Sequence, residues 1–255
     1  DTWLNTSTTL YSLLYVAEGR VLHIYNATGD NAFTSLKNCS FPDIISDLYA
    51  EGDLLIVAAG TNVYVCNVTG GVNTTISVGA TVNSVFLGDP DSDLLLDVVV
   101  GAEDSKVYVY EYNTTTGGFD LVWDSSTAFA DAVNDVVVAY DLDGDGADEI
   151  VAGGDDDYVR VFECTGDDTY EEVWSDYLGY DVLSVAVGYD LDGDGANEIL
   201  TGDYYYYVSI YECTGDDAYT YVTYFSVGYY TVWRICTNVD PVSYTHLTLP
   251  TTERV

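Results

Sequence analysis

Closely spaced carboxylates, which are able to bind a cation, occur in a nine-residue stretch that the chain contains twice. It reads Asp-Leu-Asp-Gly-Asp-Gly-Ala-Asp-Glu at 141–149 and Asp-Leu-Asp-Gly-Asp-Gly-Ala-Asn-Glu at 190–198. Carboxylates this close together repel one another strongly unless a cation lies between them. Calcium takes roughly six to eight oxygen ligands, and glycines at positions 4 and 6 let a chain curl tightly around it. The stretch therefore predicts a calcium-binding loop, with a solvated acidic turn as the alternative.

The predicted ligands are the carboxylates at positions 1, 3, 5 and 9 and the main-chain carbonyl at position 7. They are Asp141, Asp143, Asp145, Ala147 and Glu149 in the first copy, and Asp190, Asp192, Asp194, Ala196 and Glu198 in the second. An EF-hand would require an acidic residue at position 12, where this chain has Ala152 and Thr201. The flanking residues have the pattern of strands, so each loop is predicted to join two β-strands.

A third stretch keeps the acidic residues but lacks a glycine. Asp89, Asp91, Asp93 and Asp97 occupy positions 1, 3, 5 and 9, and Leu94 stands where glycine is expected. A leucine at positive φ has a steric cost. Calcium binding by this loop is therefore left open at the level of sequence.

The elements that must position these loops repeat along the chain. A strand that ends in glycine occurs five times, at Gly19, Gly60, Gly101, Gly153 and Gly202. Each copy is followed by an alternating strand, a polar turn and a further strand. With the strand that precedes the loop, each repeat has four short strands and no helix, which is typical of a β-propeller blade. The predicted fold is thus an all-β propeller of four-stranded blades, with about five blades present.

The repeats divide the chain into consecutive predicted blades. Their ranges are 1–42, 43–80, 81–133, 134–180 and 181–229, and a further blade begins at 230–240. Asn238-Val-Asp240 resembles the start of another acidic loop, which then breaks off. Residues 241–255 have no repeat character and resemble translated read-through of a sequencing adapter, so we interpret them as a non-native tail.

At residues 185–202 the chain resembles the FG-GAP/VCBS repeat family, best known from the propellers of integrin α-subunits. The resemblance is close at 134–180 and 181–229 and partial at 82–133. It implies a propeller of seven or eight blades, of which this chain is a truncated part. It also implies calcium in the loop between the first two strands of a blade, held by the positions named above, in a secreted or cell-surface protein.

Composition narrows the possible partners. The formal net charge is −37 with only six Lys plus Arg, which excludes nucleic-acid binding through phosphate contacts and disfavours anionic membranes. No apolar run is long enough to insert into a membrane. Asn-x-Ser/Thr sequons indicate an extracellular glycoprotein; they lie at Asn5, Asn26, Asn38, Asn67, Asn73 and Asn113. Five cysteines leave the disulfide pairing open, with Cys39–Cys66 as the best candidate pair.

Three functions follow as hypotheses. The leading one is an extracellular, calcium-stabilised propeller that acts in adhesion, in recognition of a protein or glycan ligand at the cell surface, or as a surface-structural module. The second is a propeller enzyme acting on polysaccharide, a lyase or glycosidase, or a quinone-dependent dehydrogenase; it rests on analogy of fold alone. His23 and His246 are the only histidines, which disfavours histidine-based catalysis. The third is a glycan-binding, lectin-like domain built from loops rich in tyrosine and aspartate.

Overall fold

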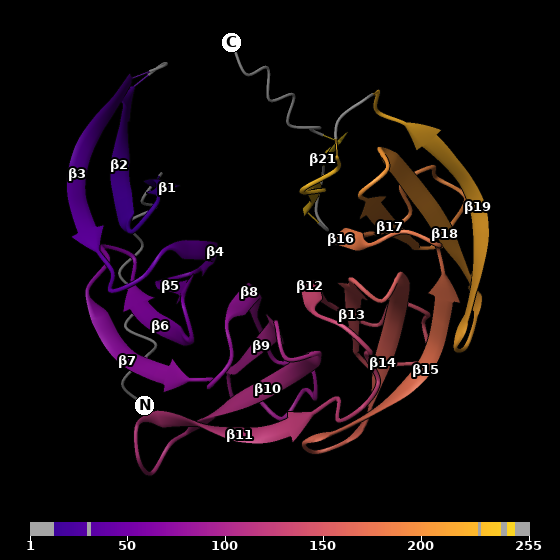
Figure 1. The fold of residues 1–255 in the computed structure, drawn as a ribbon, viewed down its shortest axis with the longest axis horizontal. Coiled ribbons are helices and arrows are strands. Elements are labelled where there is room, and N and C mark those ends of the chain that lie inside the picture. Colours follow the sequence, from indigo (N-terminus) through magenta and orange to yellow (C-terminus); the bar gives the residue numbers. More distant parts are fainter. Residues whose placement is uncertain (1–12, 30–31, 229–230, 241–243, 248–255) are drawn as a thin grey trace.

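The computed structural model describes residues 13–29, 32–228, 231–240 and 244–247. Every regular element in these ranges is a β-strand, and all paired strands are antiparallel. The four-stranded sheets stand side by side around a central hollow, each with its first strand innermost and its last strand outermost (Figure 1). The predicted all-β propeller of four-stranded blades is confirmed. No helix that could cross a membrane occurs in the described ranges.

The first two sheets lie in the N-terminal third of the chain. The first contains β1 (Leu13–Glu18), β2 (Val21–Gly29) and β3 (Ala32–Ser40). The second contains β4 (Ile45–Glu51), β5 (Leu54–Ala59), β6 (Asn62–Asn67) and β7 (Val72–Ser77). By their place in the repeat, β1 to β3 correspond to the second, third and fourth strands of the later sheets. We call these sheets blades one and two.

Three further four-stranded sheets, blades three to five, carry the acidic loops. Blade three contains β8 (Val82–Gly88), β9 (Asp97–Ala102), β10 (Lys106–Asn113) and β11 (Gly118–Asp124). Blade four contains β12 (Val133–Ala139), β13 (Glu149–Gly154), β14 (Tyr158–Gly166) and β15 (Thr169–Tyr177). Blade five contains β16 (Val182–Gly188), β17 (Glu198–Asp203), β18 (Tyr207–Gly215) and β19 (Ala218–Ser226).

The last described strands are β20 (Thr237–Asp240) and β21 (Tyr244–Leu247), which pair with each other. The fragment at 238–240, which resembles the start of a loop, therefore lies in a strand. Residues 241–243 and 248–255 of the predicted tail lie outside the described residues. The blade ranges and the non-native tail remain predictions.

Packing between blades explains the apolar character of the second strands. Every residue of β9, β13 and β17 is buried, because side chains of neighbouring blades, and in β17 also Val232 and Ile235, cover these strands. The glycines that end the motif in blades four and five, Gly153 and Gly202, have the same cause. A Cβ on Gly153 would overlap the Val182 side chain of blade five, and one on Gly202 would overlap Val232. Glycine therefore sets how closely the next blade can approach.

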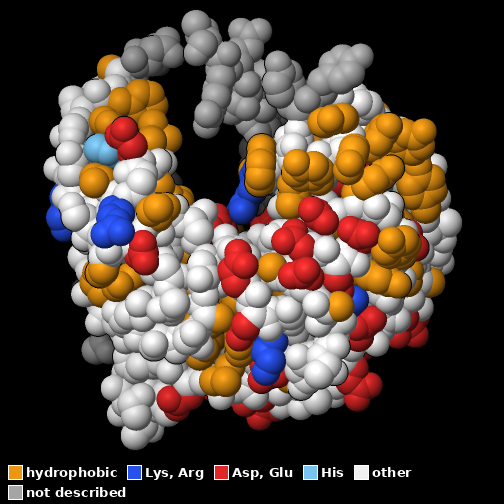
Figure 2. All heavy atoms as spheres, viewed as in Figure 1, with side chains coloured by type: hydrophobic (Ala, Val, Ile, Leu, Met, Phe, Trp, Pro, Cys, Tyr) orange, Lys and Arg blue, Asp and Glu red, His pale blue; other side chains and the backbone are white. Residues whose placement is uncertain are grey.

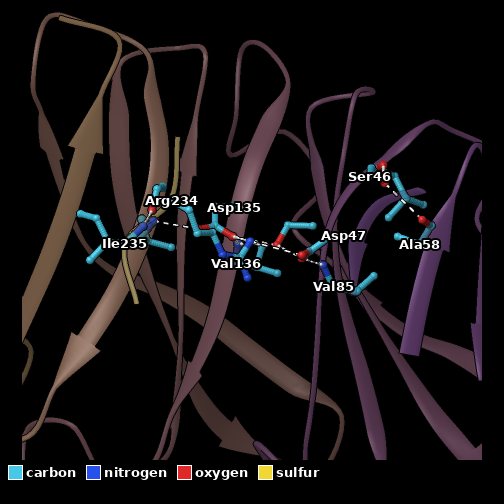
Figure 3. A network of polar contacts seen from close by, with 12 residues as sticks. Ser46, Asp47, Ala58, Val85, Asp135, Val136, Arg234 and Ile235 are labelled. Carbon is cyan, nitrogen blue, oxygen red and sulfur yellow. Dashed lines mark hydrogen bonds and ion pairs between the residues drawn. The ribbon is translucent and has the colours of Figure 1, made fainter. Parts of the chain in front are cut away.

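Polar contacts connect the innermost strands across the blades (Figure 3). The Val85 N–H donates to Asp47 at 3.0 Å, and the Val185 N–H donates to Asp135 at 3.0 Å. The Arg234 guanidinium lies 3.3 Å from Asp135 and 3.4 Å from Asp47. One arginine thus neutralises two carboxylates from different blades.

A pocket of about 500 Å³ opens at these inner strands. It is lined by Ser46, Asp47, Asn83, Asn134, Leu183, Trp233 and Arg234. Figure 2 shows the central hollow from one face, with acidic side chains gathered beside it over β12, β13 and β16.

Candidate metal centres

The three acidic loops join the first two strands of blades three, four and five. Residues 89–96 connect β8 to β9, residues 140–148 connect β12 to β13, and residues 189–197 connect β16 to β17. Ala152 and Thr201, at position 12, are buried inside β13 and β17. The strand–loop–strand context predicted from sequence is therefore confirmed, and the helix–loop–helix arrangement of an EF-hand is excluded.

In the loop of blade four the first three carboxylates turn toward one another. Asp141 has φ of +49° and accepts the Gly146 N–H at 2.8 Å. Asp143 accepts the Asp145 N–H at 3.2 Å, and Asp145 accepts the Ala147 N–H at 2.7 Å. One oxygen from each of the three aspartates lies within 4.8 Å of the other two. Two oxygens that each lie about 2.4 Å from one calcium ion are at most about 4.8 Å apart, so the arrangement fits that ion.

Glu149, at position 9, closes this loop from inside the protein. Its side chain is fully buried, and Oε2 accepts the Leu142 N–H at 2.9 Å, whereas Oε1 has no partner. Burial, followed by the charges of Asp143 and other nearby acids, raises the pKa of Glu149 to about 8. A buried carboxylate oxygen without a partner is costly. The donor set thus fits a hard cation, which would satisfy this oxygen.

The loop of blade five repeats the geometry with near-identical distances. Asp190, with φ of +51°, accepts the Gly195 N–H at 2.9 Å, and Asp192 accepts the Asp194 N–H at 3.2 Å. Asp194 accepts the Ala196 N–H at 2.9 Å. Glu198 accepts the Leu191 N–H at 2.9 Å, and burial is the main cause that raises its pKa. The two copies therefore form the same structure.

The loop of blade three reaches a similar arrangement despite its leucine. Leu94 adopts φ of +76°, its side chain is 90 % exposed, and its N–H donates to Asp89 at 3.0 Å. Asp89, Asp91 and Asp97 bring oxygens within 4.8 Å of one another, and the Leu95 N–H donates to Asp93 at 2.6 Å. Asp97 is buried with Oδ2 unpartnered, and burial followed by the Asp91 charge raises its pKa to about 9.

Sequence reasoning missed acidic residues outside the loops. Asp143 groups with Glu163 on β14 and with Asp216 and Asp217 in the β18–β19 turn of the next blade. In the same way Asp91 groups with acids of β10 and of the β14–β15 turn, which are Glu111, Asp167 and Asp168. The signal that could have revealed them is the Gly-Asp-Asp turn, which the sequence repeats at 166–168 and 215–217.

The cysteine hypothesis is not supported. Cys39 and Cys66 are free thiols, and the Cys39 thiol donates to the Gly70 carbonyl at 3.4 Å. Burial is the main cause that raises the pKa of the Cys66 thiol to about 12. The expected Cys39–Cys66 bond is therefore absent from the structure.

Comparisons with known proteins bear on the loops and on the fold. A family model described as FG-GAP-like repeat matches residues 89–152 and 141–201. No curated protein sequence matches the chain.

Solved structures match the chain as a whole. The structure of Sqt1 from Saccharomyces cerevisiae has a TM-score of 0.64 at 13 % identity; the match covers 85 % of this chain and 60 % of that one. BBS1N, crystallised in complex with ARL6DN and soaked with lead, has a TM-score of 0.61 at 18 % identity, and the match covers 91 % of this chain and 67 % of that one. At these identities the likeness shows the fold alone. The chain therefore has the β-propeller fold, and its residues 89–201 resemble FG-GAP-like repeats.

Proposed function

We propose that this chain is an extracellular propeller stabilised by calcium, which serves in adhesion, recognition or the structure of a cell surface. One observation carries the calcium part of the proposal. The carboxylate of Glu149 is fully buried with one oxygen unpartnered, and it lies against Asp145 and Glu163. No ion pair in the described part of the chain brings a lysine or arginine to these three residues. A bound cation would supply the positive charge that the chain does not bring to these carboxylates.

Each loop residue has a separate task in this proposal. Asp141, Asp143 and Asp145 bind the ion from the loop, and Glu149, which is the first residue of β13, binds it from that strand. Calcium supplies positive charge that relieves the repulsion among these carboxylates. The ion would thereby join the first two strands of a blade, and the loops at 190–198 and 89–97 would act in the same way.

Calcium removal tests the proposal directly. A site saturated at about a hundred times its dissociation constant stabilises a fold by about 2.7 kcal/mol. We expect calcium to raise the thermal midpoint relative to chelated protein at matched ionic strength. In the Asp141→Asn/Asp145→Asn variant, calcium should raise the thermal midpoint less, because one of the sites is lost. Asp53→Asn/Glu103→Gln removes two exposed acids outside the loops and should keep the full response. Equal midpoints with and without calcium in the unmodified chain would refute the proposal.

Sequons motivate the extracellular part. Five of the six lie within the described strands and turns. Asn67 and Asn113 begin the turns after β6 and β10, and Asn38 and Asn73 are exposed on outer strands. Expression with a secretion signal in eukaryotic cells, followed by glycopeptide mass spectrometry, should find glycans at these positions. Secreted chain that carries no glycan would contradict this part.

A tyrosine-rich pocket favours a glycan as the recognised ligand. It has a volume of about 370 Å³ between β15 of blade four and blade five; its lining includes Asp176, Tyr177, Tyr180, Asp203, Tyr207, Tyr211, Tyr221 and Tyr224. Aromatic faces beside a few carboxylates offer both apolar contact and hydrogen-bond acceptors. A glycan array should show binding that Tyr177→Ala/Tyr224→Ala abolishes, since both side chains are more than half exposed. An array without any bound glycan would count against this ligand class.

A further inference from the structure

The junction between blades four and five holds a second acidic cluster. Asp143 and Glu163 come from blade four, and Asp216 and Asp217 come from the β18–β19 turn of blade five. One oxygen from each residue lies within 4.8 Å of the others. The junction between blades three and four has the corresponding cluster; it consists of Asp91, Glu111, Asp167 and Asp168. In the described residues no lysine or arginine forms an ion pair with either cluster.

A buried tyrosine hydroxyl without a hydrogen-bond partner lies near the acids of each loop and junction. Tyr219 is 6 % exposed, and its hydroxyl oxygen is enclosed and makes no hydrogen bond. Burial is the main cause that raises its pKa, and the negative charges of Glu149, Asp143 and Asp217 raise it further. Tyr170 repeats this at the other junction, where it is 5 % exposed, equally unpartnered, and next to Asp97 and Asp91. A buried hydroxyl needs a partner, and a cation with its bound water supplies one.

Main-chain hydrogen bonds bring the next blade to the loop. The Asp217 N–H donates to Asp143 Oδ2 at 2.8 Å, and the Asp168 N–H donates to Asp91 Oδ2 at 3.1 Å. Both donors have positive φ, +54° and +56° respectively. Each hairpin is thus held in a strained turn that brings two more carboxylates against a loop that is already acidic.

Acidic residues occur in the turn between the last two strands of a blade when the preceding blade has an acidic loop. Blades four and five have Gly-Asp-Asp at 166–168 and 215–217, and each follows a blade with an acidic loop. Blades two and three end the equivalent turns in Thr-Gly-Gly, at 69–71 and 116–118, and each follows a blade without one. The sequence therefore pairs acidic turns with acidic loops across the blade boundary.

Charge makes one ion insufficient. The proposed ligands of the loop and the junction of blade four include seven carboxylates; they are Asp141, Asp143, Asp145, Glu149, Glu163, Asp216 and Asp217. A single calcium ion neutralises only two of these charges. In the two clusters Asp91 Oδ1, Glu163 Oε2 and Asp168 Oδ1 are enclosed and have no hydrogen-bond partner.

We propose that each junction binds a second calcium ion, which clamps adjacent blades together. In one junction the ligands are Asp143, Glu163, Asp216 and Asp217, and in the other they are Asp91, Glu111, Asp167 and Asp168. This inference rests on the proposed calcium function of the loops, because Asp143 and Asp91 each serve both ions. It differs from that function in joining two blades rather than two strands of one blade.

The experiment counts calcium ions on the full chain by native mass spectrometry during a calcium titration. Asp216→Asn/Asp217→Asn changes only the turn of blade five and should bind one ion fewer than the unmodified chain. Asp167→Asn/Asp168→Asn should do the same independently at the other junction. Asp53→Asn/Glu103→Gln, which removes two exposed charges elsewhere, should keep the full count.

The outcomes separate this inference from the proposed function. A turn variant that binds the same number of ions as the unmodified chain, with unchanged affinity, would overturn the junction site. In that case Asp141→Asn/Asp145→Asn would still lose an ion if the loop function is right. A loop variant with an unchanged count would refute the loop function instead. An unmodified chain that binds no calcium would overturn both.

Discussion

Carboxylates from different blades meet at two places in this propeller. One is the central axis, around Asp47, Asp135 and Arg234; the other, which we call the rim, comprises the acidic loops of blades three to five and the junction clusters beside them. The two places differ in how this negative charge is neutralised. At the axis, Asp135 accepts the Ser84 hydroxyl at 2.8 Å and the Val185 N–H at 3.0 Å, and Arg234 lies 3.3 Å away. Both of its oxygens have partners from the chain. At the rim, Glu149 Oε1 and Asp97 Oδ2 are equally buried and have none.

The difference shows where this chain provides its own cation. It has six Lys plus Arg against 43 Asp plus Glu, so few positive side chains are available. Arg234 neutralises the axis, and Arg160 is paired with Asp156 and Glu172. The rim has acidic groups at each blade that carries a loop, and under the proposed function an external calcium ion would neutralise them. A single arginine pairs with both carboxylates where the blades converge, whereas no lysine or arginine in the described residues forms an ion pair with the acids of the rim.

Removal of the arginine should give the largest effect from a single substitution. Arg234→Met leaves Asp135 buried without its cation, and breaking a buried pair costs about 3 kcal/mol at the lower end of the usual range. The lower end applies because the Arg234 side chain is 42 % exposed. Urea denaturation should show this loss equally in calcium and in chelator, and Asp135→Asn in the same chain should recover part of it. If Arg234→Met lowers the free energy of unfolding only in chelator, the charge at the axis also depends on calcium, and axis and rim are alike in this respect.

The pH dependence of stability should distinguish the two regions next. Without metal, burial raises the pKa of Glu149 from 4.5 to about 8 and that of Asp97 from 3.8 to about 9. A raised folded-state pKa gives stability that is fully present below the unfolded value and is lost as pH rises through the folded value. The thermal midpoint of chelated protein should therefore fall between pH 5 and pH 9.

Calcium should oppose that fall, because it binds the deprotonated carboxylates and its contribution grows with pH. Burial also raises the pKa of Asp135, but that group responds alike in both conditions. The difference between the two curves, measured by scanning fluorimetry at matched ionic strength, therefore isolates the rim. Parallel curves would show that the rim carboxylates do not respond to calcium.

Sequence predicted the parts of the rim that are local. Nine consecutive residues contain Asp141, Asp143, Asp145 and Glu149. The strand pattern on both sides of this stretch places the loop between two strands. Repetition extended the same prediction to blade five and to the propeller fold. These features depend only on contacts between near neighbours in the chain.

The junction clusters and the contacts of Arg234 depend on residues of different blades meeting one another. Neither the repeat period of the sequence nor its composition predicts these contacts. Asp217 meets Asp143 across 74 residues, and Arg234 meets Asp135 across 99. A single sequence shows the Gly-Asp-Asp turns but not which loop they face. It also gave Leu94 a steric cost without showing that Asp89 accepts its N–H and holds it at positive φ.

Substitution of Leu94 should have the smallest effect, because it changes the backbone conformation of one loop only. Leu94→Gly removes a strain of about 1–2 kcal/mol for a side chain at positive φ, and adds about 0.5–1 kcal/mol of backbone entropy cost. Little packing is lost, because the leucine side chain is 90 % exposed. We expect a net gain of roughly 0.5 kcal/mol in urea denaturation and tighter calcium binding by calorimetry.

Leu94→Ala is the matched control, because it removes the same exposed surface but keeps the Cβ and hence the strain. Gly146→Ala in blade four is the reciprocal change: its φ is +98° and a Cβ there would meet no atom within 4 Å, so only backbone strain is added. It should weaken calcium binding at that loop, while Leu94→Gly strengthens it in blade three. If neither Leu94→Gly nor Gly146→Ala changes the calcium affinity, the positive φ at these two positions does not shape the sites. The neighbouring blade must then hold the acids of the rim in place.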